Sequence, residues 1–423
     1  MTLLRFDPGL TLPVPTTFTG APEPEVVLTE EAGVRAPLGQ SLRVTPLVAE
    51  DDLVAQGAPV ACLRDAPEIR FVAPMPGRVA RIGLKPGRKL TEIVLFREVG
   101  GDVLRHPTDE AGSEPGLRRL MQASGLWPWL RRRPFGGMPN GEERPAAIVV
   151  MAADTRPLAP DPRLALAGRE AGFARGLDAL TLLTDGPVFV VAQSGPPLLE
   201  AVASGGRIRE VPCGARHPLG LAGLRIHDLC PAGLDVPVWD IHAEDVAALG
   251  ELLTTGVLPM TRLVSVAGEA LREGRLVRTQ VGADLRGLTQ RVLKPGAHRL
   301  LSGSPIDGHA AHWLAPRHRQ VSALPRKDAP GKQHWLISAL TRSASPKPII
   351  PTAALSQAFG AALPAVAFVR ALSAGDDDMA MKLGVLSLLE EDIALADYVL
   401  GGEAHLALLL RGMLDRIRKE YAA

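Results

Sequence analysis

Two strand-like apolar runs with a helical segment between them constrain the fold of this 423-residue chain most strongly. Residues 146–152, AAIVVMA, form one run, and residues 188–192, VFVVA, form the second. Continuous apolar runs rich in β-branched residues are typical of strands that are covered on both faces. Between them, Asp161 suits a helix N-cap, Pro162 suits the first helical position and Gly186 suits the end. The pattern predicts one helix and a parallel sheet.

Other segments have different patterns. Residues 243–256 predict a helix that ends at Gly256, residues 262–268 predict a further strand, and residues 275–323 alternate short strands with an amphipathic segment, as in a β-grasp module. A stretch rich in Pro, Lys and Ser, 324–350, predicts a connection. We therefore expect an α/β multidomain protein made of an N-terminal extended segment (1–41), a barrel-sandwich module (42–99), a Rossmann-like α/β domain (100–268), a β-grasp (SLBB-like) module (269–340) and a C-terminal helical domain (341–423).

Residues 42–99 contain short strands separated by an acidic turn at 50–52 and a Pro/Gly turn at 74–77. This spacing resembles the biotinyl/lipoyl-type fold, in which a lysine at a hairpin tip receives the prosthetic group. The corresponding stretch here, DAPEIRF (65–71), has no lysine. The resemblance therefore implies a structural β module and no covalent carrier.

Composition excludes several classes of protein. Cys62, Cys213 and Cys230 are too few and too scattered for a disulfide scaffold or for an iron–sulfur cluster held by four thiolates, and they fit a reducing cytoplasm. A net charge of +1 gives no global attraction to nucleic acid or anionic lipid. No apolar run approaches the roughly 18–20 residues of a membrane helix, and the N-terminus does not resemble a signal peptide. We expect a protein without a transmembrane helix that is not secreted.

Local motifs for self-contained chemistry are absent from the sequence: GxxxxGK[ST], GxSxG, HExxH and GxGxxG. A metal site is conceivable only where histidines gather, but Gly308 and Pro316 argue against the helix that would align two of them. We expect loop and surface histidines at His298, His309, His312 and His318. Two acidic runs, 376–378 and 390–392, suit the first turns of helices better than a cation site.

The least ordinary segment is GLWPWLRRRPFGGMP, residues 125–139. Tryptophan and arginine together are typical of the anchors of protein interfaces. A phosphate or anionic headgroup is the second interpretation, and a solvated basic turn is the third. We predict an exposed interface formed by Trp127, Trp129, Arg131, Arg132 and Arg133, and no catalytic, cofactor-binding or metal-binding residue.

Several stretches resemble the A subunit of the sodium-translocating NADH:quinone oxidoreductase, a bacterial respiratory complex. They follow the same order over nearly the whole chain: 9–15, 71–82, 124–139, 152–162, 176–190, 217–227, 238–256, 275–285 and 370–395. The family is related to flavin-binding subunits of complex I and Rnf, which use a glycine-rich loop and iron–sulfur cysteines. In this chain the stretch that resembles the position of that loop is SGLWPWLRRRPFGGMP, in which tryptophan and arginine stand where glycines would be needed. The resemblance therefore implies the branch of the family that binds no cofactor.

The resemblance implies a peripheral subunit on the cytoplasmic face of the inner membrane, in a hetero-oligomer that passes electrons from NADH to ubiquinone and exports sodium. FAD, FMN, riboflavin and an iron–sulfur cluster would belong to other subunits, and a contact of this chain with ubiquinone stays open.

The C-terminal sequence differs from the pattern of the family. EEDIALADYVLGGEAH (390–405) lacks the two cysteines and the Pro-Gly-Lys that usually follow, and 341–360 also differs. Two alternatives are therefore kept: a divergent regulatory or interaction protein that retains the fold, and a subunit of a related electron-transfer complex. A freestanding flavin enzyme is disfavoured by residues 127–133.

Overall fold

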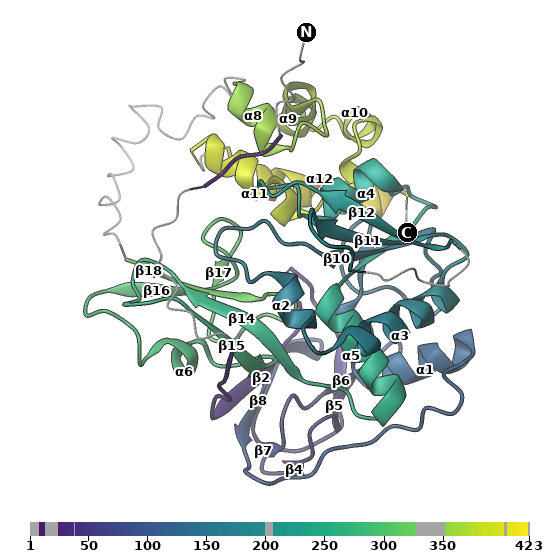
Figure 1. Ribbon diagram of the computed structural model, residues 1–423, viewed down its shortest axis with the longest axis vertical. Coiled ribbons are helices and arrows are strands. Elements are labelled where there is room, and N and C mark those ends of the chain that lie inside the picture. Colours follow the sequence, from purple (N-terminus) through teal and green to yellow (C-terminus); the bar gives the residue numbers. More distant parts are fainter. Residues whose placement is uncertain are drawn as a thin grey trace.

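The computed structural model describes residues 8–12, 24–37, 39–198, 206–326, 352–401 and 404–421. Four β-sheets and a unit of C-terminal helices make up this part of the chain. In Figure 1 the helical unit lies at the top, above the central sheet, while strands of the N-terminal module lie at the bottom.

The central sheet has five strands in the order β12-β11-β10-β13-β9. Strand β10 pairs in parallel with β11 and β13, and β11 pairs in parallel with β12, whereas β9 is antiparallel to β13. The predicted parallel pairing of the two apolar runs is therefore confirmed. The strands are β9 (Arg131–Arg133), β10 (Ala147–Ala152), β11 (Val188–Gln193), β12 (Ile208–Cys213) and β13 (Val238–His242).

Both faces of this sheet are covered. Alternate residues of β10 enter two cores: Ile148 and Val150 pack with α3 and α5, whereas Val149 packs on the opposite face with Ile226 of α4. The helices are α1 (Glu114–Ala123), α2 (Pro162–Leu166), α3 (Glu170–Leu180), α4 (Ala222–Leu229) and α5 (Ala243–Thr255), with short 3-10 turns at η1 (Trp127–Trp129) and η2 (Thr181–Leu183).

The single helix predicted after Asp161 is wrong. Asp161 does cap α2, since its side chain accepts a hydrogen bond from the amide of Arg163, but the helix stops after one turn. Gly168 has φ of +75°, which a right-handed helix cannot contain, and α3 begins two residues later. The helix predicted at 243–256 is confirmed, and its C-cap Gly256 is left-handed.

The N-terminal module contains a four-stranded sheet, β2-β8-β7-β4, and a three-stranded sheet, β3-β5-β6. Their inward side chains share one core that includes Val60, Ile93 and Leu95. The strands are β2 (Glu31–Val34), β3 (Val44–Pro46), β4 (Leu53–Val54), β5 (Pro59–Leu63), β6 (Arg70–Val72), β7 (Gly77–Lys85) and β8 (Lys89–Arg97).

A six-stranded sheet has the order β1-β15-β14-β18-β16-β17. The strand expected at 262–268 as part of the α/β domain pairs here instead, with β15 and β18, because its side chains complete this sheet's own core. The elements are β1 (Glu25–Val26), β14 (Thr261–Ala267), β15 (Arg275–Gln280), α6 (Leu285–Thr289), β16 (His298–Ser302), β17 (His309–Ala310) and β18 (Gln320–Pro325). From residue 327 on, the connection predicted at 324–350 lies outside the described residues.

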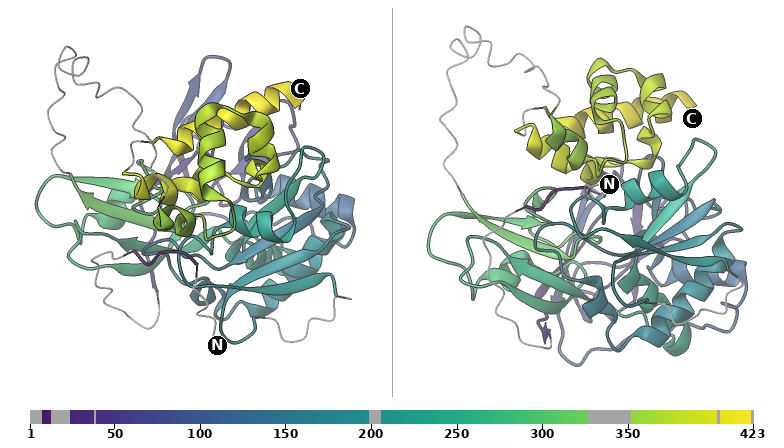
Figure 2. Two further views of the ribbon diagram at one scale, coloured as in Figure 1. Left: turned by 90° about the horizontal axis from the view of Figure 1, so that it is seen from above. Right: turned by 45° about the horizontal axis from the view of Figure 1, so that its top comes forward.

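The C-terminal helices surround their own core and pack against the side of the central sheet that carries α4 (Figure 2). Gly375 ends α9 in the left-handed conformation, and the Asp376 side chain caps α10, as predicted. The elements are α8 (Ala353–Ala358), α9 (Ala365–Ala374), α10 (Asp377–Lys382), η3 (Val385–Ser387), α11 (Glu390–Val399) and α12 (Leu406–Tyr421). Among the helices of the described segments, none has the length and apolar character needed to cross a bilayer.

Candidate functional site

The three consecutive arginines form strand β9 at the edge of the central sheet. The register pairs Arg131 with Asp240 and Arg133 with Val238 of β13. Because successive side chains of a strand point to opposite faces, Arg131 and Arg133 share one face while Arg132 points to the other. The face with two arginines is the one toward helix α11.

On that face the arginines form a buried ion-pair cluster, which we call the arginine junction: Arg131, Arg133, Asp240, Glu391 and Asp392. Arg133 is fully buried; its Nη1 lies 2.5 Å from Oδ2 of Asp240, and its Nη2 lies 3.4 Å from Oδ2 of Asp392. Arg131 binds the Glu391 carboxylate through its two terminal nitrogens, Nη1 at 2.5 Å and Nη2 at 2.7 Å. The cluster thus joins the sheet edge to the first turn of α11.

Asp392 connects three elements. Its Oδ1 accepts a hydrogen bond from the amide of Gly223 in α4 at 3.0 Å, and its Oδ2 accepts one from the amide of Leu389 at 2.8 Å. A Cβ on Gly223 would lie 2.1 Å from the carboxylate, so only glycine permits this approach. The expected position of 390–392 in a helix first turn is confirmed, but these acids are also counterions of buried arginines.

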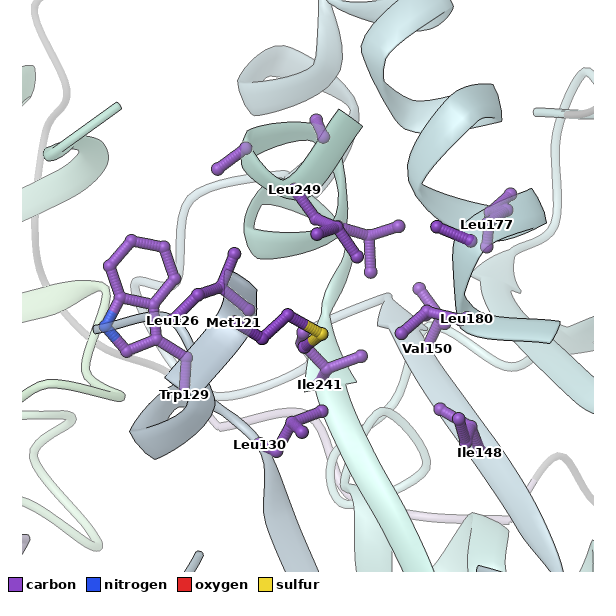
Figure 3. Close-up of a cluster of buried hydrophobic side chains, with 14 of the residues drawn as sticks. Met121, Leu126, Trp129, Leu130, Ile148, Val150, Leu177, Leu180, Ile241 and Leu249 are labelled. Atoms are coloured by element: carbon purple, nitrogen blue, oxygen red, sulfur yellow. The ribbon is translucent and has the colours of Figure 1, made fainter. Parts of the chain in front are cut away.

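The two tryptophans lie inside the chain, so the prediction of an exposed interface is wrong for their side chains and for Arg133. Trp127 is fully buried and Trp129 is 5% exposed. The Trp127 indole N–H donates to the carbonyl of Pro139 at 3.0 Å, and its ring meets that of Trp239 edge to face at 5.5 Å. Figure 3 shows Trp129 beside Leu126 at one side of the buried cluster.

Arg132, on the opposite face, is paired separately. Its Nε lies 2.9 Å from Oε2 of Glu143, and Glu143 also accepts the indole N–H of Trp239 at 2.7 Å. The side chains of Arg131 and Arg132 keep about one fifth of their surface exposed, at 22% and 17%. The segment therefore binds this chain's own elements, and of its five predicted interface residues only Arg131 and Arg132 reach the surface in part.

A second group of largely buried arginines, Arg317 and Arg319, directly precedes strand β18 of the six-stranded sheet. Arg317 pairs with Asp240, and its Nη1 donates to the carbonyl of Trp129 at 2.6 Å. Arg319 pairs with Glu244 and Asp245, the acids in the first turn of α5, at 3.1 and 2.7 Å. These contacts fix the six-stranded sheet to the central one, so Asp240 links both groups of arginines.

Burial perturbs the titration of the carboxylates at α11. Burial alone would raise the pKa of Glu391, but the charges of Arg131 and Arg133 hold it well below its usual value. Burial, together with the negative charge of Glu391, raises the pKa of Asp392 to about 6, although Arg133 opposes this. Two neighbouring buried acids are thus driven apart in pKa, as expected for like charges that share a site.

The four histidines do not assemble a metal site. His298 and His312 are exposed, and His309 lies in strand β17 rather than in a helix, as expected. His318 is within 2.8 Å of the Ser302 hydroxyl, and burial lowers its pKa to about 4. Within the described ranges, no three His, Cys, Asp or Glu side chains are grouped to hold a metal ion.

Two cavities lie next to these clusters. One, of about 320 Å³ including space open to solvent, lies at the carboxyl ends of β10 and β13, where strand order reverses and α/β proteins often bind ligands. Among its charged lining residues, Glu244 and Arg319 are paired with each other and Asp154 is paired with Arg156. The other, of about 520 Å³, is lined mainly by apolar residues, among them Phe71, Pro128 and Trp129.

Sequence reasoning missed the partners of the arginines. Asp240 was detectable, because an acid inside the apolar run VWDIH (238–242) has to be paired when the strand is buried. Glu391 and Asp392 carried no such signal, since acids are ordinary in a helix first turn. Arg317 and Arg319 likewise lie far away in sequence, and only the tertiary fold brings them to the site.

Two family models match the chain. One is described as the NqrA second alpha/beta domain and matches residues 113–258, the segment that contains the central sheet. The other is described as the NQRA C-terminal domain, an SLBB domain, and matches residues 263–312 in the six-stranded sheet. The first of these matches contains Arg131, Arg133 and Asp240, whereas Arg317, Arg319 and the acids of α11 lie outside both.

Curated relatives match along the full length. The A subunit of the Na(+)-translocating NADH-quinone reductase is 32% identical in Pseudomonas aeruginosa strain UCBPP-PA14 and 33% identical in Vibrio campbellii, over 99% of this chain and 100% of each relative. The solved NAD+-reducing [NiFe]-hydrogenase in its air-oxidized state is 14% identical, with a TM-score of 0.39, over 73% of this chain and 64% of that one. By its full-length identity to the curated relatives, the chain belongs to the family of the A subunits of the Na(+)-translocating NADH-quinone reductases.

Proposed function

We propose that the chain is the peripheral A subunit of a sodium-translocating NADH:quinone reductase, on the cytoplasmic face of the bacterial inner membrane. In this proposal it holds no redox cofactor; FAD, FMN, riboflavin and the iron–sulfur cluster belong to partner subunits, and electrons pass from NADH to ubiquinone. The observation that carries the proposal is the identity of about one third with A-subunit relatives over the full length of both chains.

The finer fold assignments belong to the same proposal: a biotinyl/lipoyl-like barrel-sandwich, a Rossmann-like domain, a β-grasp module and a C-terminal helical domain. Residues 124–139 resemble the position of the flavin loop in the complex I and Rnf subunits, and their structure supports a subunit without flavin. Its side chains Trp127 and Arg133 are fully buried and paired within the chain, so a flavin phosphate would have to displace ion pairs rather than meet free backbone amides. Partner contacts of this segment would involve the exposed edges of Arg131 and Arg132.

The test is recovery of the tagged full-length chain from its native membrane, followed by identification of the proteins that come with it. Co-purification with the remaining subunits, and a purified chain without stoichiometric FMN, are expected. Recovery only as a free cytosolic protein would instead favour the alternative of a divergent regulatory or interaction protein. Recovery with other membrane partners would favour a related electron-transfer complex.

A contact with ubiquinone is the furthest-reaching part of the proposal. The apolar cavity beside Trp129 supports it, because Phe71, Pro128 and Met260 offer the kind of lining that small-molecule sites use. A soluble short-chain ubiquinone should quench tryptophan fluorescence saturably, and less so after Trp129→Phe. Quenching that does not saturate, or that is unchanged in the variant, contradicts a contact at this cavity.

A further inference from the structure

The hairpin of β7 and β8 ends in a row of basic residues. Lys85 lies directly opposite Lys89 across the hairpin. Arg43 forms an antiparallel bridge with Lys89, and the amide of Arg64 donates to the carbonyl of Arg43 at 2.9 Å. Directly opposed residues of antiparallel segments point to the same face, so Lys85, Lys89 and Arg43 project together, and Arg64 lies next to Arg43 just after β5. With Arg88 in the connecting turn they form what we call the basic tip: Arg43, Arg64, Lys85, Arg88 and Lys89.

This arrangement is unfavourable for the fold by itself. Like charges directly opposite each other destabilise a sheet. Arg88 adds a second cost, because its φ of +59° is a left-handed conformation that glycine or asparagine adopts more easily. Local rules are broken twice within five residues, which is typical of functional positions rather than structural ones.

No acid compensates the charge. All five residues of the basic tip are exposed, and in the part of the chain that the structure describes, none of their side chains makes a hydrogen bond or ion pair. Cations elsewhere on the same sheet are paired, as Arg81 with Glu92 and Arg97 with Glu30 show. What distinguishes the tip is that its unpaired cations lie side by side, whereas the other cations of β7 and β8 are paired.

The form of the basic tip indicates the partner. Neighbouring backbone segments about 4.8 Å apart spread the four cations over roughly 14 Å, which makes a broad charged surface rather than a fork for one ligand. Lys85 and Lys89 act as point charges rather than as directional forks, and the exposed Leu84 precedes them at the tip. Charge combined with an exposed leucine fits a fluid anionic surface better than a specific acidic peptide.

We propose that the basic tip binds the anionic phospholipid headgroups of a bilayer surface. The proposal goes beyond the assignment to a respiratory complex and does not depend on it, since the contact belongs to this chain alone. The net charge of only +1 makes the attraction local, so the tip sets which face of the protein meets the membrane.

The test uses the full-length chain and sedimentation with vesicles of phosphatidylcholine, with and without about one third phosphatidylglycerol. Binding is expected only with the anionic vesicles, and it should disappear near 1 M salt, where the Debye length is about 3 Å. The triple variant K85Q/R88Q/K89Q should lower the partition coefficient roughly 100-fold. The control R286Q/R291Q/R299Q removes the same charge from exposed sites in α6, just after it, and in β16, and it should bind like the wild type.

A further variant separates binding from folding. Lys89→Glu places unlike charges opposite each other, so it should leave the melting temperature unchanged or raise it while it lowers vesicle binding. No binding of the wild type to anionic vesicles at low salt would overturn the proposal, and so would equal losses in the two triple variants. Binding of soluble polyglutamate without binding of vesicles would also overturn it, and would assign the tip to an acidic protein segment.

Discussion

Replacement of Arg133 by methionine is expected to loosen the attachment of helix α11 to the central sheet, and to do so in a pH-dependent way. Without the guanidinium, Asp240 keeps Arg317 and Glu391 keeps Arg131. Asp392 is affected most, since among the described residues Arg133 is the guanidinium with which it forms an ion pair. The carboxylate is then left buried with backbone amides alone.

The magnitude follows from this loss. Removing one partner of a buried ion pair costs about 3–5 kcal/mol when the other charge stays uncompensated. At pH 8 this corresponds to roughly 10²- to 10⁴-fold faster hydrogen exchange of the α11 amides when exchange follows local opening of the helix. At pH 5 the effect should be smaller, because the pKa of Asp392 is already about 6 with Arg133 present and rises further without it.

Arg132→Met is the matched control. It removes the same group from the neighbouring residue, but Arg132 points to the opposite face and pairs with Glu143. Exchange in α11 should therefore stay close to that of the wild type. Equal acceleration in both variants, or an effect of Arg133→Met that is the same at pH 5 and pH 8, would refute the assignment of the pH dependence to Asp392.

Three further outcomes are expected. Trp127→Ala should destabilise the folded chain by about 3–5 kcal/mol in urea unfolding, as for core tryptophans, whereas a surface anchor would change stability little. Gly176→Ala should lower the melting temperature by several degrees and Gly412→Ala should not, because a Cβ at Gly176 would lie 2.0 Å from the carbonyl oxygen of Val246 and nothing lies near Gly412. Asp392→Asn should remove a pH dependence of the free energy of unfolding. The pKa of Asp392 is about 6 in the folded chain and near 3.9 in the unfolded chain, so between these pH values the native state binds the proton more tightly. The wild type therefore loses up to about 1.4 kcal/mol of stability per pH unit as the pH rises from 4 to 6. A wild-type-minus-variant difference that is flat over this range contradicts that assignment.

The sequence predicted what depends on local patterns and missed what depends on long-range pairing. The parallel pairing of β10 with β11 and the end of α5 at Gly256 were predictable, because periodicity and capping residues are local signals. The break at Gly168 was missed, since a single glycine inside a helical pattern is usually tolerated. The interpretation of residues 127–133 failed for a similar reason: Trp and Arg mark an exposed anchor only when their partners lie in another chain, and here Asp240 and Asp392 supply them from within.

The main role of the arginine junction is to fix the relative positions of the parts that it joins, rather than to stabilise the fold. Apolar side chains could replace a buried ion cluster at little or no cost, so its net stabilisation is small. Its geometry is demanding, however: Arg131, Arg133 and Arg317 meet Asp240, Glu391 and Asp392 only when the six-stranded sheet and the C-terminal helices are both docked on the same edge of the central sheet. An apolar junction would tolerate sliding of these parts, whereas misplacement here leaves charges buried without partners. The arginines of β9 therefore fix how the six-stranded sheet and the C-terminal helices are placed on the central sheet.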